Sequence, residues 1–120
     1  MGNINRGEVD LVAGDEIHRL RLTFNSLCAL EDVAQKSATE FFADLLGTAT
    51  AGGIDFRMLR TAMWAALLHH NPSMTLPEAG AVIDAVGLPE SVKAVQAAIV
   101  AFFPKAETPQ DPAGADTENP

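Results

Sequence analysis

The sequence contains a single cysteine, a single tryptophan and no tyrosine among its 120 residues. One cysteine excludes an internal disulfide and is typical of a protein from a reducing compartment. Because aromatic residues are scarce, a core must be built mainly from Ala, Leu, Val, Phe and Met. The hydrophobic content of 48% is nevertheless that of a folding chain, and the length predicts one domain.

Basic residues are also few, with 8 Lys and Arg against 16 Asp and Glu and a formal net charge of -8. Binding to a nucleic-acid backbone requires clustered Lys and Arg, so this composition argues against nucleic-acid partners. An acidic surface favours solubility and a basic or apolar protein partner.

Long hydrophobic runs are missing as well. The most apolar stretches, residues 62–68 and 94–103, are too short and too rich in alanine to span a bilayer. The N-terminal residues are polar and charged, without the apolar core of a signal peptide. We therefore expect a cytoplasmic protein that does not enter a membrane.

Residues 7–23 alternate between apolar and charged side chains, which predicts a β-hairpin. A two-residue turn at Gly14-Asp15 sets the register. It places Asp10 opposite Arg19, and by the same register Glu8 opposite Arg21, Val9 opposite Leu20 and Leu11 opposite His18. One face is then rich in ion pairs and the other is mostly apolar, because side chains alternate along a strand.

Val12 and Ile17 fall on the charged face of this hairpin, where apolar side chains are unexpected. The hairpin also has two open edges that invite strand addition from another chain, although the charges of Arg19 and Arg21 and their acidic neighbours blunt such edges. Both interpretations stay open. We take Val12, Ile17, Arg19 and Arg21 as candidates for a protein interface.

Helix signals follow the hairpin. Thr23, Ser37 with Glu40, Asp55, and Thr75 with Glu78 are typical N-terminal caps, and Pro89 opens a last helix. The apolar periodicity between these caps and the following breakers predicts helices over residues 24–34, 38–47, 55–70, 76–86 and 89–103. The small-residue run to Gly53 is predicted to be a loop. The expected fold is α+β: an N-terminal β-hairpin packed on a bundle of about five α-helices, forming one domain over residues 1–103.

Residues 104–120 form an acidic, proline-rich tail that has no large apolar side chain. Such a segment cannot bury enough surface to offset the entropy of ordering, so we expect it to be disordered.

The helix predicted at 55–70 carries two apolar stripes, whereas an ordinary surface helix needs only one. It is either a central helix inside the core or a helix that also contacts a partner, and the central position is favoured in a domain this small. Met and Trp are enriched in adaptable binding surfaces. Met58, Trp64 and Leu68 are therefore interface candidates.

The last predicted helix ends in an apolar cluster that includes Phe102 and Phe103. Part of this surface can cover the core, and part can serve self-association or a client protein. We include both phenylalanines among the interface candidates.

Catalytic and metal-binding patterns are weak. His69 and His70 are adjacent, so on a helix they point about 100° apart and do not form a chelating pair. Cys28 lies between Leu27 and Leu30 with acidic neighbours, which predicts a small core residue rather than a nucleophile. The sequence has no glycine-rich phosphate loop and no hydrolase or metalloprotease motif. We predict a non-enzymatic protein without a metal or cofactor.

Three blocks of sequence resemble the small tail assembly chaperones of tailed phages and gene transfer agents. The matching residues lie in an opening block, a hairpin-to-helix block and a later block: Asn3, Arg6, Gly7, Glu8 and Val9; Leu20, Arg21, Leu22, Thr23, Phe24, Asn25, Leu27, Cys28, Leu30 and Glu31; Thr75, Glu78, Ile83 and Asp84. The resemblance covers about residues 3–88.

This resemblance implies a protein that binds the tape measure protein, the tail tube protein or both during tail assembly in the bacterial host cytoplasm and is missing from the mature particle. A homo-oligomer is compatible with it. The alternative is a small acidic helical adaptor or regulatory protein that acts by self-association or by binding another protein.

Overall fold

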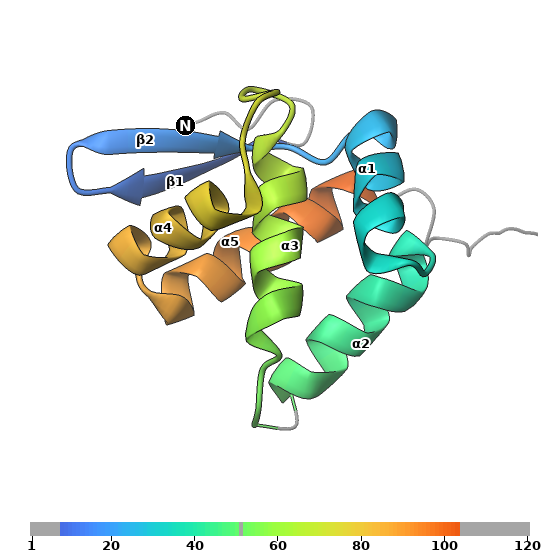
Figure 1. Cartoon of the computed structure of the whole chain (residues 1–120). Helices are drawn as coiled ribbons and strands as arrows, with labels where there is room; N and C mark the ends of the chain where they lie inside the picture. Colours follow the sequence, from blue (N-terminus) through green and yellow to red (C-terminus); the bar gives the residue numbers. More distant parts are fainter. Residues whose placement is uncertain (1–7, 51, 104–120) are drawn as a thin grey trace, which may run out of the picture.

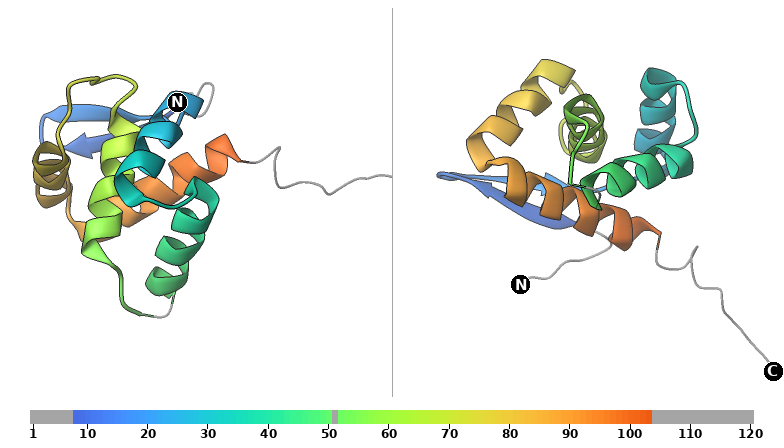
Figure 2. Two further views of the ribbon diagram at one scale, coloured as in Figure 1. Left: turned by 45° about the vertical axis from the view of Figure 1, so that its right-hand side comes forward. Right: turned by 90° about the horizontal axis from the view of Figure 1, so that it is seen from below.

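The computed structural model describes residues 8–50 and 52–103, which form a two-stranded antiparallel hairpin followed by five helices (Figure 1). The predicted α+β class is therefore confirmed. The predicted disordered tail, residues 104–120, lies outside the described residues. Figure 2 shows the hairpin along one side of the helices, with α3 in the middle of the helical layer.

The hairpin consists of β1, Val9–Ala13, and β2, Glu16–Leu20. Its register pairs Asp10 with Arg19 and Leu11 with His18, as predicted from the two-residue turn. The predicted pairing of Glu8 with Arg21 is wrong because the ladder ends at Leu20. There the chain leaves the sheet, and the Arg21 N–H donates to the carbonyl of Ala66 on α3 at 2.8 Å.

Helix α1, Phe24–Ala34, begins at the predicted cap Thr23, whose hydroxyl accepts from the Ser26 N–H at 3.1 Å. The Ser26 hydroxyl accepts in turn from the Thr23 N–H at 2.8 Å. These reciprocal bonds satisfy two of the donors that every helix start leaves open. Gln35 ends the helix in the left-handed conformation, at φ 60°.

Helix α2, Ala38–Thr50, is longer than the predicted 38–47. Gly47 does not end it, because glycine weakens a helix interior by only about 0.5–1 kcal/mol. In the next turn the Thr48 and Thr50 hydroxyls donate to the carbonyls of Leu45 and Leu46 at 2.9 Å and 2.8 Å. The small-residue loop predicted after this helix therefore begins later in the chain, because α2 continues to Thr50.

Helix α3, Phe56–Leu67, is shorter than the predicted 55–70. Asp55 is its cap and not its first residue, since its carboxylate accepts from the Met58 N–H at 3.1 Å. At the other end Pro72 disfavours helical geometry at Asn71. The chain turns there, with the Asn71 N–H donating to the Leu67 carbonyl at 2.9 Å.

Helices α4, Leu76–Val86, and α5, Leu88–Phe102, meet at Gly87 and are bent by 118° relative to each other. Gly87 has φ of 100°, a region that other residues rarely adopt, and this conformation permits the abrupt change of direction. α5 starts one residue before the predicted 89 because Pro89 occupies its first turn. It ends at Phe102, and Phe103 is the cap.

Helix α3 is the centre of the molecule, and it packs against α1, α2, α4, α5 and β2. Met63 and Leu67 on α3, and Leu20 and Leu30 from the hairpin and α1, are completely buried. Within residues 8–50 and 52–103, no single helix is long and apolar enough to cross a membrane. In the same part of the chain, α4 and α5 together reach that length and composition, but as a bent pair.

Candidate functional site

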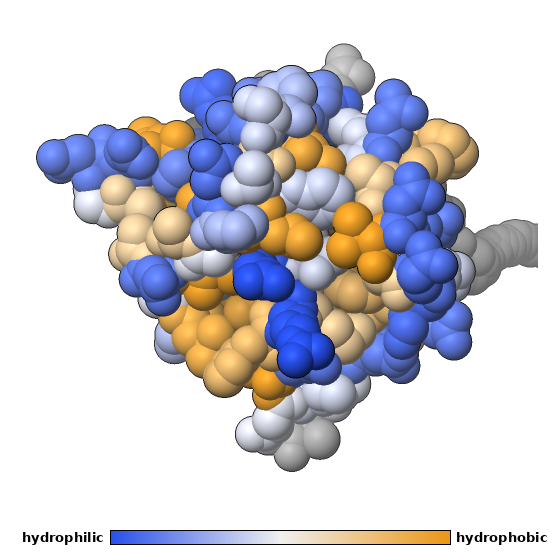
Figure 3. Space-filling model, in the orientation of Figure 1, coloured by the Kyte–Doolittle hydropathy of each residue, from blue (hydrophilic) through white to orange (hydrophobic). Residues whose placement is uncertain are grey.

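An open groove of about 740 Å³ lies between α3 and α4 on the described part of the chain and reaches the start of α5. Its lining is mostly apolar and comes from all three helices: Phe56, Leu59, Pro77, Gly80, Ala81, Ile83, Gly87 and Leu88. Three charged residues, Arg57, Arg60 and Asp84, complete it. Figure 3 shows this face, with apolar side chains around two strongly hydrophilic ones.

Phe56 and Leu88 form exposed apolar edges of the groove. Phe56 is 66% exposed and Leu88 is 39% exposed. Both positions follow from local structure, since each residue is the first of its helix. A first-turn side chain can lie beyond the packed part of the helix. The deeper Leu59, at 2% exposure, belongs to the core beneath them.

Arg57 and Arg60 bring positive charge into this apolar setting. They are three residues apart on α3, so they lie on neighbouring positions of one helix face. The aliphatic stem of Arg60 packs over Gly80 of α4, where a Cβ atom would lie 3.4 Å from the Arg60 Cδ. Gly80 therefore permits close approach of the arginine stem to α4.

The guanidinium groups have no carboxylate partner in the described ranges 8–50 and 52–103. Asp84 lines the same groove without forming an ion pair with either arginine. The Nε atom of Arg60 is buried and has no hydrogen-bond partner among the described residues. A buried donor without a partner costs about 1–3 kcal/mol.

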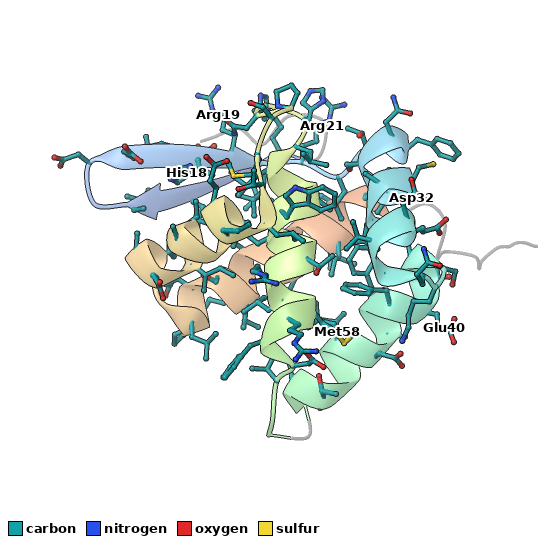
Figure 4. All side chains as sticks on the ribbon, in the orientation of Figure 1. His18, Arg19, Arg21, Asp32, Glu40 and Met58 are labelled. Atoms are coloured by element: carbon teal, nitrogen blue, oxygen red, sulfur yellow. The ribbon has the colours of Figure 1, made fainter. Side chains whose placement is uncertain are left out.

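The predicted hairpin candidates lie on a separate surface. Val12 and Ile17 pair with each other across the strands and are both 61% exposed, on the face that points away from the core. Arg19 Nε lies 3.6 Å from the Asp10 carboxylate, also exposed. Figure 4 shows Arg19 and Arg21 along the upper edge of the molecule.

The three candidates on α3 lie closer to the core. Trp64 is half-buried, and its indole Nε1–H donates to the Met74 carbonyl at 2.8 Å. Met58, labelled in Figure 4, lines a second hollow of about 410 Å³ between α1, α2 and α3. Leu68 is half-buried just beyond the end of the helix. This placement favours the central-helix interpretation of α3.

Lys36 also lines the hollow beside Met58. The hydrogen bond that its Nζ donates to the Asp44 carboxylate at 2.9 Å, together with the negative charge of that carboxylate, raises the pKa of Lys36 above its ordinary value. The ion pair therefore contributes to stability at neutral pH, and this contribution is lost in alkaline solution as the pH rises through the raised pKa of Lys36.

Phe102 and Phe103 are half-buried at the end of α5 and pack on the core. The Phe103 ring lies edge-on to Phe42 of α2, with ring centroids 6.1 Å apart. The outward face of α5 instead carries Val100, which is 67% exposed. Val100 belongs to the apolar cluster predicted at the end of this helix, but it was not chosen as an interface candidate.

Cys28 is exposed, so its prediction as a core residue is wrong. The buried side of α1 is formed by Ser26, Leu27 and Leu30, and Cys28 lies outside this side of the helix. His70 Nε2 lies 2.7 Å from the Glu8 carboxylate and connects the hairpin to the turn after α3. Among the residues that the structure describes, no three His, Cys, Asp or Glu side chains are grouped as a metal site would require.

The structure thus does not gather the predicted candidates into one site. The groove residues Phe56, Arg57, Arg60 and Leu88 were missed as interface candidates. The available signals were the Arg-x-x-Arg spacing and two large apolar residues directly after a cap. Comparison with known proteins gave no match to a family model, a curated protein or a solved structure.

Proposed function

We propose that this protein is a non-enzymatic assembly chaperone of a phage-like tail, which binds the tape measure protein, tail tube subunits or both in the bacterial cytoplasm and is absent from the finished particle. The sequence resemblance described above is the source of this assignment. The observation that carries it further is the exposed apolar groove between α3 and α4, on a domain whose core is otherwise well buried.

The mechanism that we propose is shielding. A tape measure protein is a long, largely helical chain whose apolar stripes aggregate when no tube surrounds them. Several copies of a small acidic domain cover those stripes and keep the complex soluble through their negative charge. Many weak contacts along one chain give high avidity while each single contact remains easy to release. Tube subunits then displace the chaperone as they polymerise.

Co-expression tests this function directly. The tape measure protein from the same genome is produced alone and together with this chain, and its soluble fraction is measured. We expect the soluble fraction to rise and the two proteins to co-purify. A tape measure protein that stays insoluble in both cases would contradict the proposal. Mass spectrometry of purified particles should not detect the chain, whereas a structural virion protein would be present.

The alternative function, a small acidic adaptor that acts by self-association, is favoured by a different surface. Val12 and Ile17 on the hairpin and Val100 on α5 are exposed apolar side chains outside the groove. An adaptor of this kind would be a dimer or larger oligomer by itself. Sedimentation of the isolated protein separates the two functions when it is combined with the co-expression result.

A further inference from the structure

The groove between α3 and α4 combines two features on an otherwise acidic protein. Its lining is mostly apolar, and it holds two guanidinium groups that have no carboxylate partner among the described residues. Arg57 and Arg60 are two of only 8 basic residues in the chain. A ligand that suits this groove must offer both apolar surface and negative charge.

We propose that the groove binds an amphipathic α-helix of a partner protein, with apolar side chains seated between Phe56 and Leu88 and carboxylates directed at Arg57 and Arg60. The inference rests on the proposed function only for the identity of the partner, which would be the tape measure protein. Arginine suits this role because its planar guanidinium binds a carboxylate through two parallel hydrogen bonds.

A helix fits better than an extended peptide because the walls of the groove are themselves helices. Their backbone N–H and C=O groups are already paired within α3 and α4, so an extended peptide would find no strand edge to join. A helical partner satisfies its own backbone. It presents apolar side chains three and four residues apart, in a stripe that a groove between two helices can accept.

The charges in the groove also predict which side of the bound helix is acidic. Arg57 and Arg60 lie on α3, whereas Asp84 lies on α4. A helix with carboxylates on the α3 side and neutral or basic residues on the α4 side matches both walls. The reversed arrangement places like charges together, which disfavours it.

Two other possible occupants of the groove, the C-terminal segment and a second copy of the chain, match its apolar lining and its charges less well. Residues 104–120 are acidic but contain no large apolar residue, so they would leave Phe56 and Leu88 uncovered. A second copy of the chain in a two-fold arrangement would present the same surface to itself. Where α3 of one copy faces α3 of the other, the two arginine pairs approach each other, and their repulsion opposes that dimer.

The proposal is tested with the full-length chain and two synthetic helices of about 18 residues, or five turns. Both helices carry a leucine stripe. One has glutamates along one flank of the stripe and the other has lysines at the same positions. Fluorescence anisotropy measures each dissociation constant. We expect the glutamate helix to bind roughly tenfold or more tightly than the lysine helix.

Matched variants assign the binding to the groove. Phe56→Ser and Phe24→Ser both remove an exposed phenylalanine from the first position of a helix, 66% and 76% exposed respectively, but only Phe56 lines the groove. Arg57→Glu and Arg19→Glu change the net charge equally. We expect Phe56→Ser and Arg57→Glu to weaken binding of the glutamate helix by roughly tenfold or more, and the other two variants to leave it unchanged.

Equal affinity for both helices, no binding of either, or equal losses in Phe24→Ser and Phe56→Ser would overturn the proposal. Displacement of the glutamate helix by an equimolar peptide of residues 104–120 would also overturn it, because the tail would then be the occupant. A dimer of the chain that dissociates in the Phe56→Ser variant would overturn it as well, because a second copy would then be the occupant. Co-expression distinguishes failure of the groove proposal from failure of the chaperone function. If wild-type and Phe56→Ser chains solubilise the tape measure protein equally, the groove proposal fails while the chaperone function stands. If neither chain solubilises it but the glutamate helix binds as expected, only the chaperone function fails.

Discussion

Trp64 of α3 is half-buried, and its side chain contacts the segment that leads from α3 into α4. It is the only tryptophan, on the central helix, and large aromatic residues often dominate binding surfaces. Its indole nevertheless donates to the Met74 carbonyl at 2.8 Å, which fixes the connection between α3 and α4. The groove depends on this connection because its two walls are the helices that the connection joins.

We predict that Trp64→Phe lowers the free energy of unfolding by about 1–3 kcal/mol, because the Met74 carbonyl loses its donor. Urea denaturation followed by far-UV circular dichroism measures the change without relying on tryptophan fluorescence. Unchanged stability together with loss of tape measure binding would instead assign Trp64 to the interface.

At the scale of the element, two glycines differ in whether their backbone conformation requires glycine. Gly47 lies inside α2 with open space around the position of a Cβ atom, and its φ is not in the left-handed region. Gly87 joins α4 and α5 and also has open space, but its φ is 100°. Steric room is therefore equal, and only the backbone conformation differs.

Gly47→Ala should raise the free energy of unfolding by about 0.5–1 kcal/mol, because alanine loses less conformational freedom in a helix. Gly87→Ala is the matched control, and it should lower stability by about 1–3 kcal/mol through backbone strain. Thermal and urea unfolding of both variants measure these effects. A decrease in stability for Gly47→Ala would mean that α2 does not continue through residue 47.

At the scale of the whole molecule, the hairpin and the helices are expected to unfold as one unit. An isolated two-stranded hairpin is at best marginally stable in water. Here its apolar face is covered, with Leu20 completely buried, and the Arg21 N–H bonds to Ala66 of α3. The sheet therefore depends on the helices for its stability.

Leu20→Ala should lower the free energy of unfolding of the whole domain by about 2–5 kcal/mol, the usual cost of a cavity in a core. Hydrogen exchange should show equal losses of protection for the Arg21 amide and for amides in the middle of α3. Ile17→Ala on the exposed face of the same strand is the control and should change stability by at most about 0.5 kcal/mol. Loss of protection in the hairpin alone would contradict a single cooperative unit.

The sequence by itself determined the fold class, the hairpin register and most helix starts. These features follow from short-range physics: alternation along a strand, a two-residue turn, and caps such as Thr23, Asp55 and Thr75 that satisfy backbone donors three residues away. Helix ends were less predictable. A glycine such as Gly47 does not end a helix by itself, whereas Pro72 disfavours helical geometry at the residue before it.

Only the tertiary structure decided which side chains remain exposed. Periodicity places Phe56 on an apolar stripe and Cys28 between core leucines, but it does not say which element covers each position. Packing leaves both side chains exposed and brings Arg60 of α3 over Gly80 of α4, twenty positions along the chain. A binding groove is made by the approach of distant segments, and for that reason local pattern alone could not locate it.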